Sequence, residues 1–189
     1  MAERHEIRLC GRGGQGMILA GHITGQAASI FEHKHATLIQ DYGPEARGGA
    51  CRADVVISEE RVLYPYINAP SVLVAMSQEA YDKYCPKNRE DTLVIIDKDL
   101  VKPKTTRGKR LLAVPAGRIA EELGRVTVAN VVMLGFITAA TNIVSVEAMR
   151  KAILASVPKG TEELNIGAFE RGYAYGLEKL GSNREARGI

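Results

Sequence analysis

The stretch LCGRGGQGM, residues 9–17, decides how the chain begins to fold. It ends a short apolar run, residues 7–10, that predicts a buried strand, and it leads into residues 17–30, which predict a helix rich in small side chains. Between them, glycine occupies four of the six positions from 11 to 16. This strand, loop and helix unit raises the question of whether the glycines hold a nucleotide phosphate or form a bend needed for another reason.

The same alternation of strands and helices continues along the chain. Further apolar runs predict strands at residues 36–40, 52–58, 71–76, 92–96 and 111–114. Helices are predicted at residues 78–84, 115–124, 128–140 and 145–157, followed by a last helix capped by Asn165. We therefore expect an α/β fold: a single domain over residues 1–189, with a mostly parallel central sheet flanked by helices and a helical C-terminal third. Ligands or partners of such a sheet lie beyond the carboxyl ends of its strands, so both glycine-rich loops are expected there.

Two features of this pattern lead to more specific expectations. Residues 52–58 alternate apolar and polar side chains, and with residues 62–64 they are expected to form a hairpin, although its turn lacks the preferred glycine or asparagine. Gly167, Gly172 and Gly176 recur along the last helix. They indicate close helix contacts, either within the fold or across a subunit interface.

Composition limits the classes of function. The 189 residues carry 25 Lys and Arg against 22 Asp and Glu, a formal net charge of +3, and these charges lie in short mixed groups. Because no basic stripe is interleaved with aromatic side chains, nucleic-acid binding is not expected. The N-terminus lacks the apolar core of a secretory signal, and the longest apolar stretch, residues 126–140, is shorter than the ~20 residues of a membrane span. We expect a cytoplasmic protein with no membrane segment.

The chain offers no self-sufficient catalytic or metal-binding pattern. Three dispersed cysteines, Cys10, Cys51 and Cys85, make neither a disulfide framework nor a C-x-x-C pair for zinc or an iron–sulfur cluster. The four histidines form no zinc-binding motif, and no serine occupies G-x-S-x-G. We therefore predict no catalytic residue and no metal site here, and any redox metal must come from elsewhere.

The first glycine loop matches a nucleotide motif in part. Gly11, Gly13 and Gly16 satisfy G-x-G-x-x-G between a strand and a helix, and Asp41 could hold ribose hydroxyls. A P-loop is excluded, because Met17 and Ile18 stand where Lys and Ser or Thr must hold phosphate and magnesium. The alternative to a ligand site is structural: glycines allow tight turns and close packing of helix and strand.

The two glycine-rich loops together form a more specific sequence pattern than either loop alone. GRGGQG at residues 11–16, followed by YGPEARGG at residues 42–49, resembles the gamma subunit of the 2-oxoacid:ferredoxin oxidoreductases. The resemblance extends to ADVVIS, NVVMLG and NIGAFERG at residues 53–58, 130–135 and 165–172. Within the second loop, Ala46 and Gly49 are most similar to the 2-oxoglutarate branch.

This resemblance implies a cytoplasmic heteromeric enzyme that decarboxylates a 2-oxoacid, transfers the acyl group to coenzyme A and passes electrons to ferredoxin. It implies alpha and beta partner subunits, in some complexes with a delta subunit. Thiamine diphosphate, magnesium and iron–sulfur clusters are carried mainly by those partners, so this chain is expected to bind none of them alone. A chain without cluster-spaced cysteines agrees with that division.

The residues assigned to binding by this resemblance lie in the two loops. They are Gly11, Arg12, Gly13, Gly14, Gln15, Gly16, Tyr42, Gly43, Glu45, Arg47, Gly48 and Gly49. The first loop can point backbone N–H groups at an anion such as a coenzyme A phosphate or at a partner's carbonyls, with side-chain bonds from Arg12 and Gln15.

In the second loop, Pro44 stiffens the turn, and Arg47 offers a fork suited to carboxylate or phosphate, with Glu45 pairing to it or to a neighbouring subunit. The alternatives are a surface arginine at position 12 and an ordered turn with an internal ion pair. If Arg47 engages substrate, coenzyme A or a partner, Arg47→Ala should lower the activity of the assembled enzyme and leave the chain folded.

Two other functions stay open at this point. One is a stand-alone Rossmann oxidoreductase, which would bind NAD(H), NADP(H) or FAD as an isolated chain. The other is an adaptor of similar fold without enzymatic activity, which would copurify with partners that lack 2-oxoacid activity.

Overall fold

A computed structural model shows a six-stranded sheet in the order β2-β3-β1-β4-β5-β6. The structure describes residues 3–42, 49–87, 89–104 and 110–185. The strands are β1 (Arg4–Arg12), β2 (His35–Asp41), β3 (Ala50–Ser58), β4 (Val72–Ala75), β5 (Leu93–Asp97) and β6 (Arg110–Val114). The helices are α1 (Met17–Gln26), α2 (Gln78–Tyr84), α3 (Ala116–Glu122), α4 (Ala129–Thr141), α5 (Val146–Ser156) and α6 (Glu162–Glu185). Short π or 3-10 turns extend three of them: η1 (Ala27–Phe31), η2 (Cys85–Lys87) and η3 (Val126–Val128).

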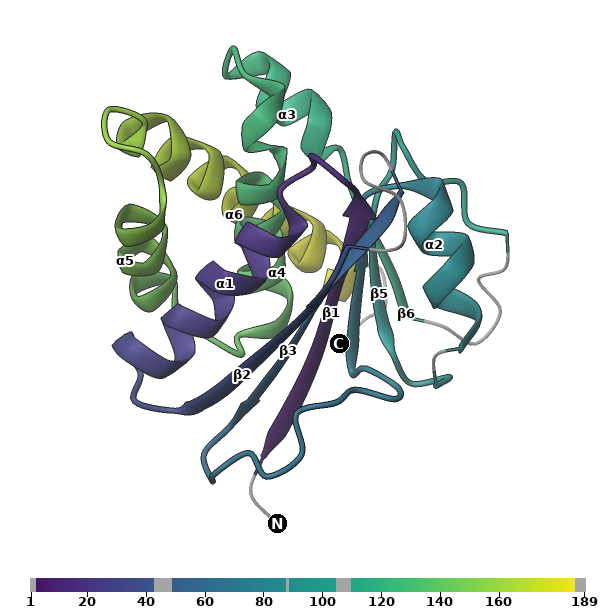
Figure 1. Ribbon diagram of the computed structural model, residues 1–189. Coiled ribbons are helices and arrows are strands. Elements are labelled where there is room, and N and C mark those ends of the chain that lie inside the picture. Colours follow the sequence, from purple (N-terminus) through teal and green to yellow (C-terminus); the bar gives the residue numbers. More distant parts are fainter. Residues whose placement is uncertain (1–2, 43–48, 88, 105–109, 186–189) are drawn as a thin grey trace.

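Helices cover both faces of this sheet, as the alternation in the sequence predicts (Figure 1). One core lies between the sheet and the side that carries α1 and α3 to α6. A smaller core lies on the opposite face, where α2 covers residues such as Leu73, Ala75, Val94 and Ile96. The expected α/β class with a mostly parallel sheet and a helical C-terminal third is therefore confirmed. Within the described ranges, no helix is both long enough and apolar enough to cross a membrane.

Strand β3 departs from the parallel pattern. It runs antiparallel between β1 and β2, with Leu9 opposite Ala53 and Leu38 opposite Val55. β4, β5 and β6 then add to β1 in parallel. Consequently β1, β2 and the three later strands all end at the same edge of the sheet, where the glycine-rich loops begin.

The predicted hairpin with residues 62–64 is wrong. No strand occurs in residues 59–71, and β3 pairs with β1 and β2 instead. The polar side chain at the centre of β3 is not solvent-exposed either: Asp54 accepts two hydrogen bonds of 2.7 Å from the Arg8 guanidinium, and both side chains are 5% exposed. Arg8 also donates to the carbonyl of Ile67, so this buried pair holds the irregular segment 59–71 against the sheet.

Of the two helix caps predicted from the sequence, one is confirmed and one is wrong. Ser145 caps α5 as expected, accepting a bond from the Ala148 N–H. Asn165 does not cap the last helix, which begins at Glu162. Its amide lies one turn inside the helix and donates to the Thr161 carbonyl at 2.8 Å, because Thr161 stands where the chain enters the helix.

Glycines of the last helix make close contacts with another helix of the same chain. A Cβ at Gly172 would collide with the carbonyl of Val132, and a Cβ at Gly176 would lie 2.7 Å from the Cβ of Ala139. Val132 and Ala139 both belong to α4. Gly135 of α4 is equally tight against the backbone of α6 at Phe169. Gly167, in contrast, has open space around it. Two of the three glycines therefore serve a contact within the fold.

Candidate functional site

The first glycine loop connects the carboxyl end of β1 to the start of α1. Gly14 and Gly16 have φ angles of 98° and 72°, values that side chains other than glycine rarely adopt. Gly16 is the N-cap residue of α1, and no side chain caps this helix end. The first N–H groups of α1 therefore lack a side-chain acceptor, which is the condition under which a helix start binds an anion.

Gln15 holds the loop together from inside. Its side-chain oxygen accepts a 2.6 Å hydrogen bond from the Arg12 N–H, and its amide nitrogen donates at 2.7 Å to the carbonyl of Met76, just beyond β4. One carboxamide thus joins the ends of two neighbouring strands. A Cβ at Gly11 would lie 2.7 Å from the same Gln15 oxygen, so that glycine is needed for close approach.

Asn130 supports the loop from the other side. It lies in the first turn of α4, is 3% exposed, and its amide donates at 3.2 Å to the Gly16 carbonyl. A Cβ at Gly16 would collide with this amide. Sequence reasoning did not select Asn130 as a site residue; the available signal was a polar side chain inside an otherwise apolar stretch.

The second loop meets the first at the same edge. The Gly13 N–H donates to the Gly49 carbonyl at 3.0 Å, immediately before β3 begins. Tyr42, after the end of β2, is 60% exposed and bonds through its hydroxyl to Gln40. The expectation that both loops lie at carboxyl ends of strands is confirmed for their described residues. Gly43, Glu45, Arg47 and Gly48 lie outside the described residues.

The meeting point presents exposed groups to solvent. Arg12, Gly13 and Gly14 are exposed, whereas Gln15 and Gly16 are half-buried. The nearby carboxylate of Glu79 accepts the Ala50 N–H at 3.2 Å, which fixes the start of β3. The edge therefore combines backbone donors and one guanidinium on a rigid base, an arrangement suited to phosphate or carboxylate oxygens.

Strand order argues against a dinucleotide site of the Rossmann kind. In that site the acid on the second strand lies next to the glycine loop, because the second strand pairs directly with the first. Here β3 separates β2 from β1, and Asp41 lies 3.6 Å from the Nε of Arg52 on β3. Asp41 therefore stands one strand further from the loop than a ribose-binding acid would.

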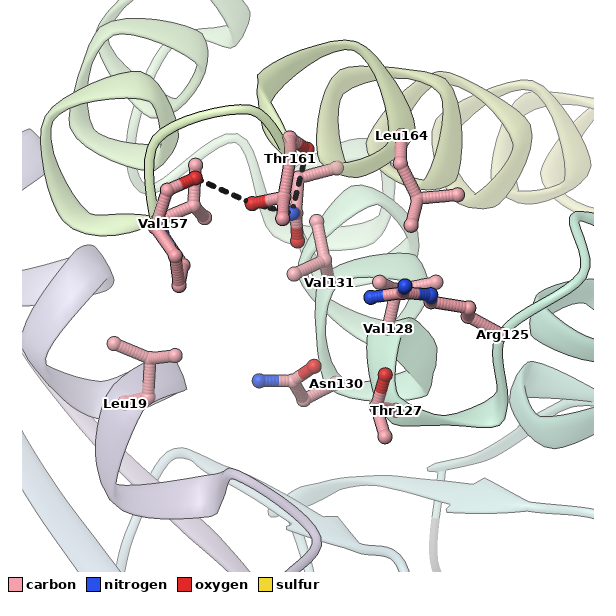
Figure 2. A pocket seen from close by; sticks show the side chains of 11 residues that line it. Leu19, Arg125, Thr127, Val128, Asn130, Val131, Val157, Thr161 and Leu164 are labelled. Carbon is pink, nitrogen blue, oxygen red and sulfur yellow. Dashed lines mark hydrogen bonds between the residues drawn. The ribbon is translucent and has the colours of Figure 1, made fainter.

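A pocket of about 180 Å³ lies next to the loop (Figure 2). Asn130 belongs to its wall, and its amide points toward the side where Leu19 of α1 lies. The pocket's other lining residues come from Arg125 and η3, from α4, from the passage between α5 and α6, and from the first turn of α6: Arg125, Thr127, Val128, Val131, Val157, Pro158, Thr161, Leu164 and Asn165. The wall is thus mainly apolar, with an exposed guanidinium at Arg125.

The cysteines do not resemble a metal or redox site. All three are free and buried. Burial raises the pKa of the Cys10 and Cys51 thiols above its ordinary value, so both stay protonated at neutral pH. In the part of the chain that the structure describes, no group of three or more His, Cys, Asp and Glu side chains could hold a metal ion.

A family model and individual relatives of known name place this chain in the same protein family. The model of the pyruvate ferredoxin/flavodoxin oxidoreductase family matches residues 6–175. The chain is 51% identical over 178 residues to the 2-oxoglutarate synthase subunit KorC of Methanocaldococcus jannaschii, covering 93% of this chain and 95% of that one. It is 30% identical to the pyruvate synthase subunit PorC of the same organism, covering 93% and 99%.

Solved structures agree with the sequence matches. The gamma subunit of a keto/oxoacid ferredoxin oxidoreductase from Geobacter sulfurreducens has a TM-score of 0.85 at 42% identity, covering 94% of this chain and 98% of that one. The 2-oxoglutarate:ferredoxin oxidoreductase from Magnetococcus marinus, solved with 2-oxoglutarate, coenzyme A and succinyl-CoA, shares the fold with a TM-score of 0.81 at 22% identity. That match covers 92% of this chain but 31% of the longer one. The resemblance inferred from the paired glycine loops is confirmed: the chain belongs to the pyruvate ferredoxin/flavodoxin oxidoreductase family, as a gamma-type subunit.

Proposed function

We propose that this chain is the gamma subunit of an enzyme that oxidatively decarboxylates 2-oxoglutarate to its acyl-coenzyme A product and passes the electrons to ferredoxin. The observation that carries the choice of substrate is the difference between 51% identity to a 2-oxoglutarate synthase subunit and 30% identity to a pyruvate synthase subunit, at the same 93% coverage of this chain. Catalysis belongs to the assembly, and this chain contributes binding and positioning.

The need for partner subunits is supported by the occurrence of this fold within a longer chain of a related enzyme. In the Magnetococcus enzyme a region of this fold makes up 31% of a longer chain, which means that it works there joined to further protein. We infer that this chain reaches the same arrangement by assembly with alpha and beta subunits, in some complexes with a delta subunit. We place thiamine diphosphate, magnesium and iron–sulfur clusters on those partners.

Coenzyme A is the ligand that we assign to the edge formed by the two glycine loops. The fit rests on the uncapped start of α1 at Gly16, on the exposed peptide of Gly14, and on the Arg12 guanidinium. These donors suit phosphate oxygens. When bound, coenzyme A supplies the thiol that takes up the acyl group.

The remaining site residues act on the shape of this edge. Gln15 and Asn130 hold the loop so that its peptides face solvent, since their amides bond inward to Met76 and Gly16. The adjoining pocket, with its apolar wall and Arg125, offers room for another part of the same extended ligand. Binding of this kind would orient the coenzyme without any proton transfer by this chain.

The substrate is tested by tagging the chain in its host, purifying it gently without oxygen, and measuring coenzyme A-dependent viologen reduction. We expect activity with 2-oxoglutarate that exceeds activity with pyruvate and branched 2-oxoacids, in an eluate that retains partner subunits. A preferred substrate other than 2-oxoglutarate would reject the substrate assignment. A single chain without 2-oxoacid activity would reject the proposed function and call for titration with NAD(H), NADP(H) and FAD, whereas partners without 2-oxoacid activity would favour the adaptor.

The coenzyme A assignment needs a separate variant in the assembled enzyme. Arg12→Ala should raise the KM for coenzyme A about tenfold or less, the range expected for one exposed charged contact, and leave the KM for 2-oxoglutarate unchanged. Arg89→Ala is the matched control, because Arg89 is an exposed arginine paired with Asp91 away from the loops. Equal effects of the two variants on the KM for coenzyme A would remove Arg12 from the site.

A further inference from the structure

The free edge of β2 is the feature of the molecule that the proposed function does not use. β2 is the outermost strand of the sheet, and within the described ranges it pairs with β3 alone. Its seven residues, HATLIQD, include no proline and no lysine. Natural edge strands are commonly protected by such residues, by bulges or by short length. The opposite edge strand, β6, is shorter and begins with Arg110.

The edge is also apolar enough to gain from being covered. Ala36, Thr37, Leu38 and Ile39 are all half-buried, so each retains surface that a neighbouring strand would remove from water. η1 packs against β2 and carries Ile30, a residue that is 55% exposed. An apolar margin therefore extends from the strand onto the adjacent helical turn.

The sequence of β2 is complementary to itself when reversed. A two-fold axis perpendicular to the sheet, midway between the Leu38 residues of two copies, pairs all seven residues in antiparallel register. The same face of each sheet then lies on the same side of the combined sheet. The facing pairs are then Leu38 with Leu38, Thr37 with Ile39, Ala36 with Gln40 and His35 with Asp41. An imidazole thus faces a carboxylate at both ends, Ala36 faces the exposed Gln40, and apolar or small side chains face one another at the three central positions.

Both ends of the strand reach solvent. His35 is exposed, and the Asp41 side chain is 44% exposed while it also pairs with Arg52. A carboxylate has lone pairs for more than one donor, so it can accept from an imidazole N–H and keep its own arginine. Because the arrangement is symmetric, the same favourable pair forms twice.

We propose that two copies of this chain associate through their β2 edges, in antiparallel register about Leu38, to form one continuous sheet across the pair. Main-chain hydrogen bonds between the two strands provide the affinity, and the His35 to Asp41 pairs set the register. The occupant is a second copy, because the complementarity is between β2 and its own reversed sequence.

Sedimentation velocity of the full chain over a wide concentration range tests the association. We expect a reversible dimer. His35→Asp places like charges opposite each other at both ends, so it should weaken the dimer roughly tenfold. His35→Gln keeps a hydrogen-bond donor and should stay close to the parent chain. A monomer at every concentration, or equal weakening by both variants, would overturn the proposal.

Cross-linking tests the register directly. A cysteine at position 38 lies beside the two-fold axis and should join two copies through a disulfide or a short bis-maleimide. A cysteine at position 40 faces residue 36 of the other copy, about 13 Å from its own equivalent, and should not. The native cysteines are buried and do not compete.

The same two variants carry the test into the assembled enzyme. There, joining of residue 38 to its own copy supports the proposal. Equal cross-linking at both positions, or joining of residue 38 to a different subunit, contradicts it.

Discussion

Glycine serves opposite purposes in two regions of this molecule. In the loop between β1 and α1, Gly14 and Gly16 have positive φ angles, and Gly14 has no atom near the position of a Cβ. Between α4 and α6, Gly135 and Gly172 have ordinary helical backbones but no room for a Cβ, because each lies against the backbone of the other helix. The loop therefore uses glycine for conformation, and the helix pair uses it for close approach.

The difference separates the expected consequences of substitution. The helix pair lies in the main core, where added volume is resisted by backbone on both sides. The loop lies at the surface, where a change of shape can alter binding while most of the core stays packed. Substitutions in the helix pair should therefore affect stability, and those in the loop should affect activity more than stability.

The largest effect is expected for Gly172→Ala. Its Cβ would press on the Val132 carbonyl, and neither helix backbone can move without disturbing the core. We expect the free energy of unfolding to fall by about 3 kcal/mol, measured by chemical denaturation.

Gly167→Ala is the matched control on the same helix. It adds a methyl group in open space and should stabilise the chain by about 0.5–1 kcal/mol through helix propensity. Similar destabilisation by both substitutions would show that the helix, rather than its contact with α4, is sensitive.

Gly16→Ala should give the second largest effect and affect both properties. An alanine at this φ costs about 1–2 kcal/mol, and its Cβ displaces the Asn130 amide. We expect that loss of stability together with a higher KM for coenzyme A in the assembled enzyme. Gly25→Ala, inside α1 and in open space, should leave the KM unchanged and raise stability by about 0.5–1 kcal/mol through helix propensity. A stable Gly16→Ala enzyme with unchanged KM would mean that the loop's shape does not matter for binding.

Gln15→Glu tests the loop with almost no change in size. The carboxylate retains an acceptor for the Arg12 N–H but loses the donor to the Met76 carbonyl. We expect a decrease in stability of about 1–2 kcal/mol and a measurable rise in the KM for coenzyme A. Loss of stability without a change in KM would assign Gln15 to the fold alone.

The smallest effect is expected outside both regions, at Glu32. Burial raises the pKa of this carboxyl, but the bonds from the Ser145 N–H and from Lys34 outweigh it and hold the pKa below the ordinary value of 4.5. A depressed folded-state pKa stabilises the fold above the unfolded-state value, and this contribution is lost as the pH falls through the folded-state value.

Glu32→Gln should therefore lower stability by about 1 kcal/mol at neutral pH, through the weaker bond to the start of α5. Denaturation curves of the variant and the parent should converge at acidic pH below 4.5. A difference that stays constant across this range would show that the charge of Glu32 has no part in it.

Local patterns determined much of this protein. The apolar runs predicted the strands, α2 matched residues 78–84, and Ser145 was recognised as the cap of α5. The pairing of two glycine-rich loops predicted the family, which the comparisons confirmed. These features depend on residues close together in the chain, and their physical causes, namely side-chain periodicity, capping and backbone conformation, act over the same short range.

The tertiary structure alone decided which segments meet. The insertion of β3 between β1 and β2, the bond from Asn130 to Gly16 and the bridge of Gln15 to Met76 join residues far apart in sequence. An alternating strand looks the same whether its polar side faces water or, as in β3, a buried Arg8. Such choices depend on the packing of the whole chain, because a buried polar group is stable only when a distant segment supplies its partner.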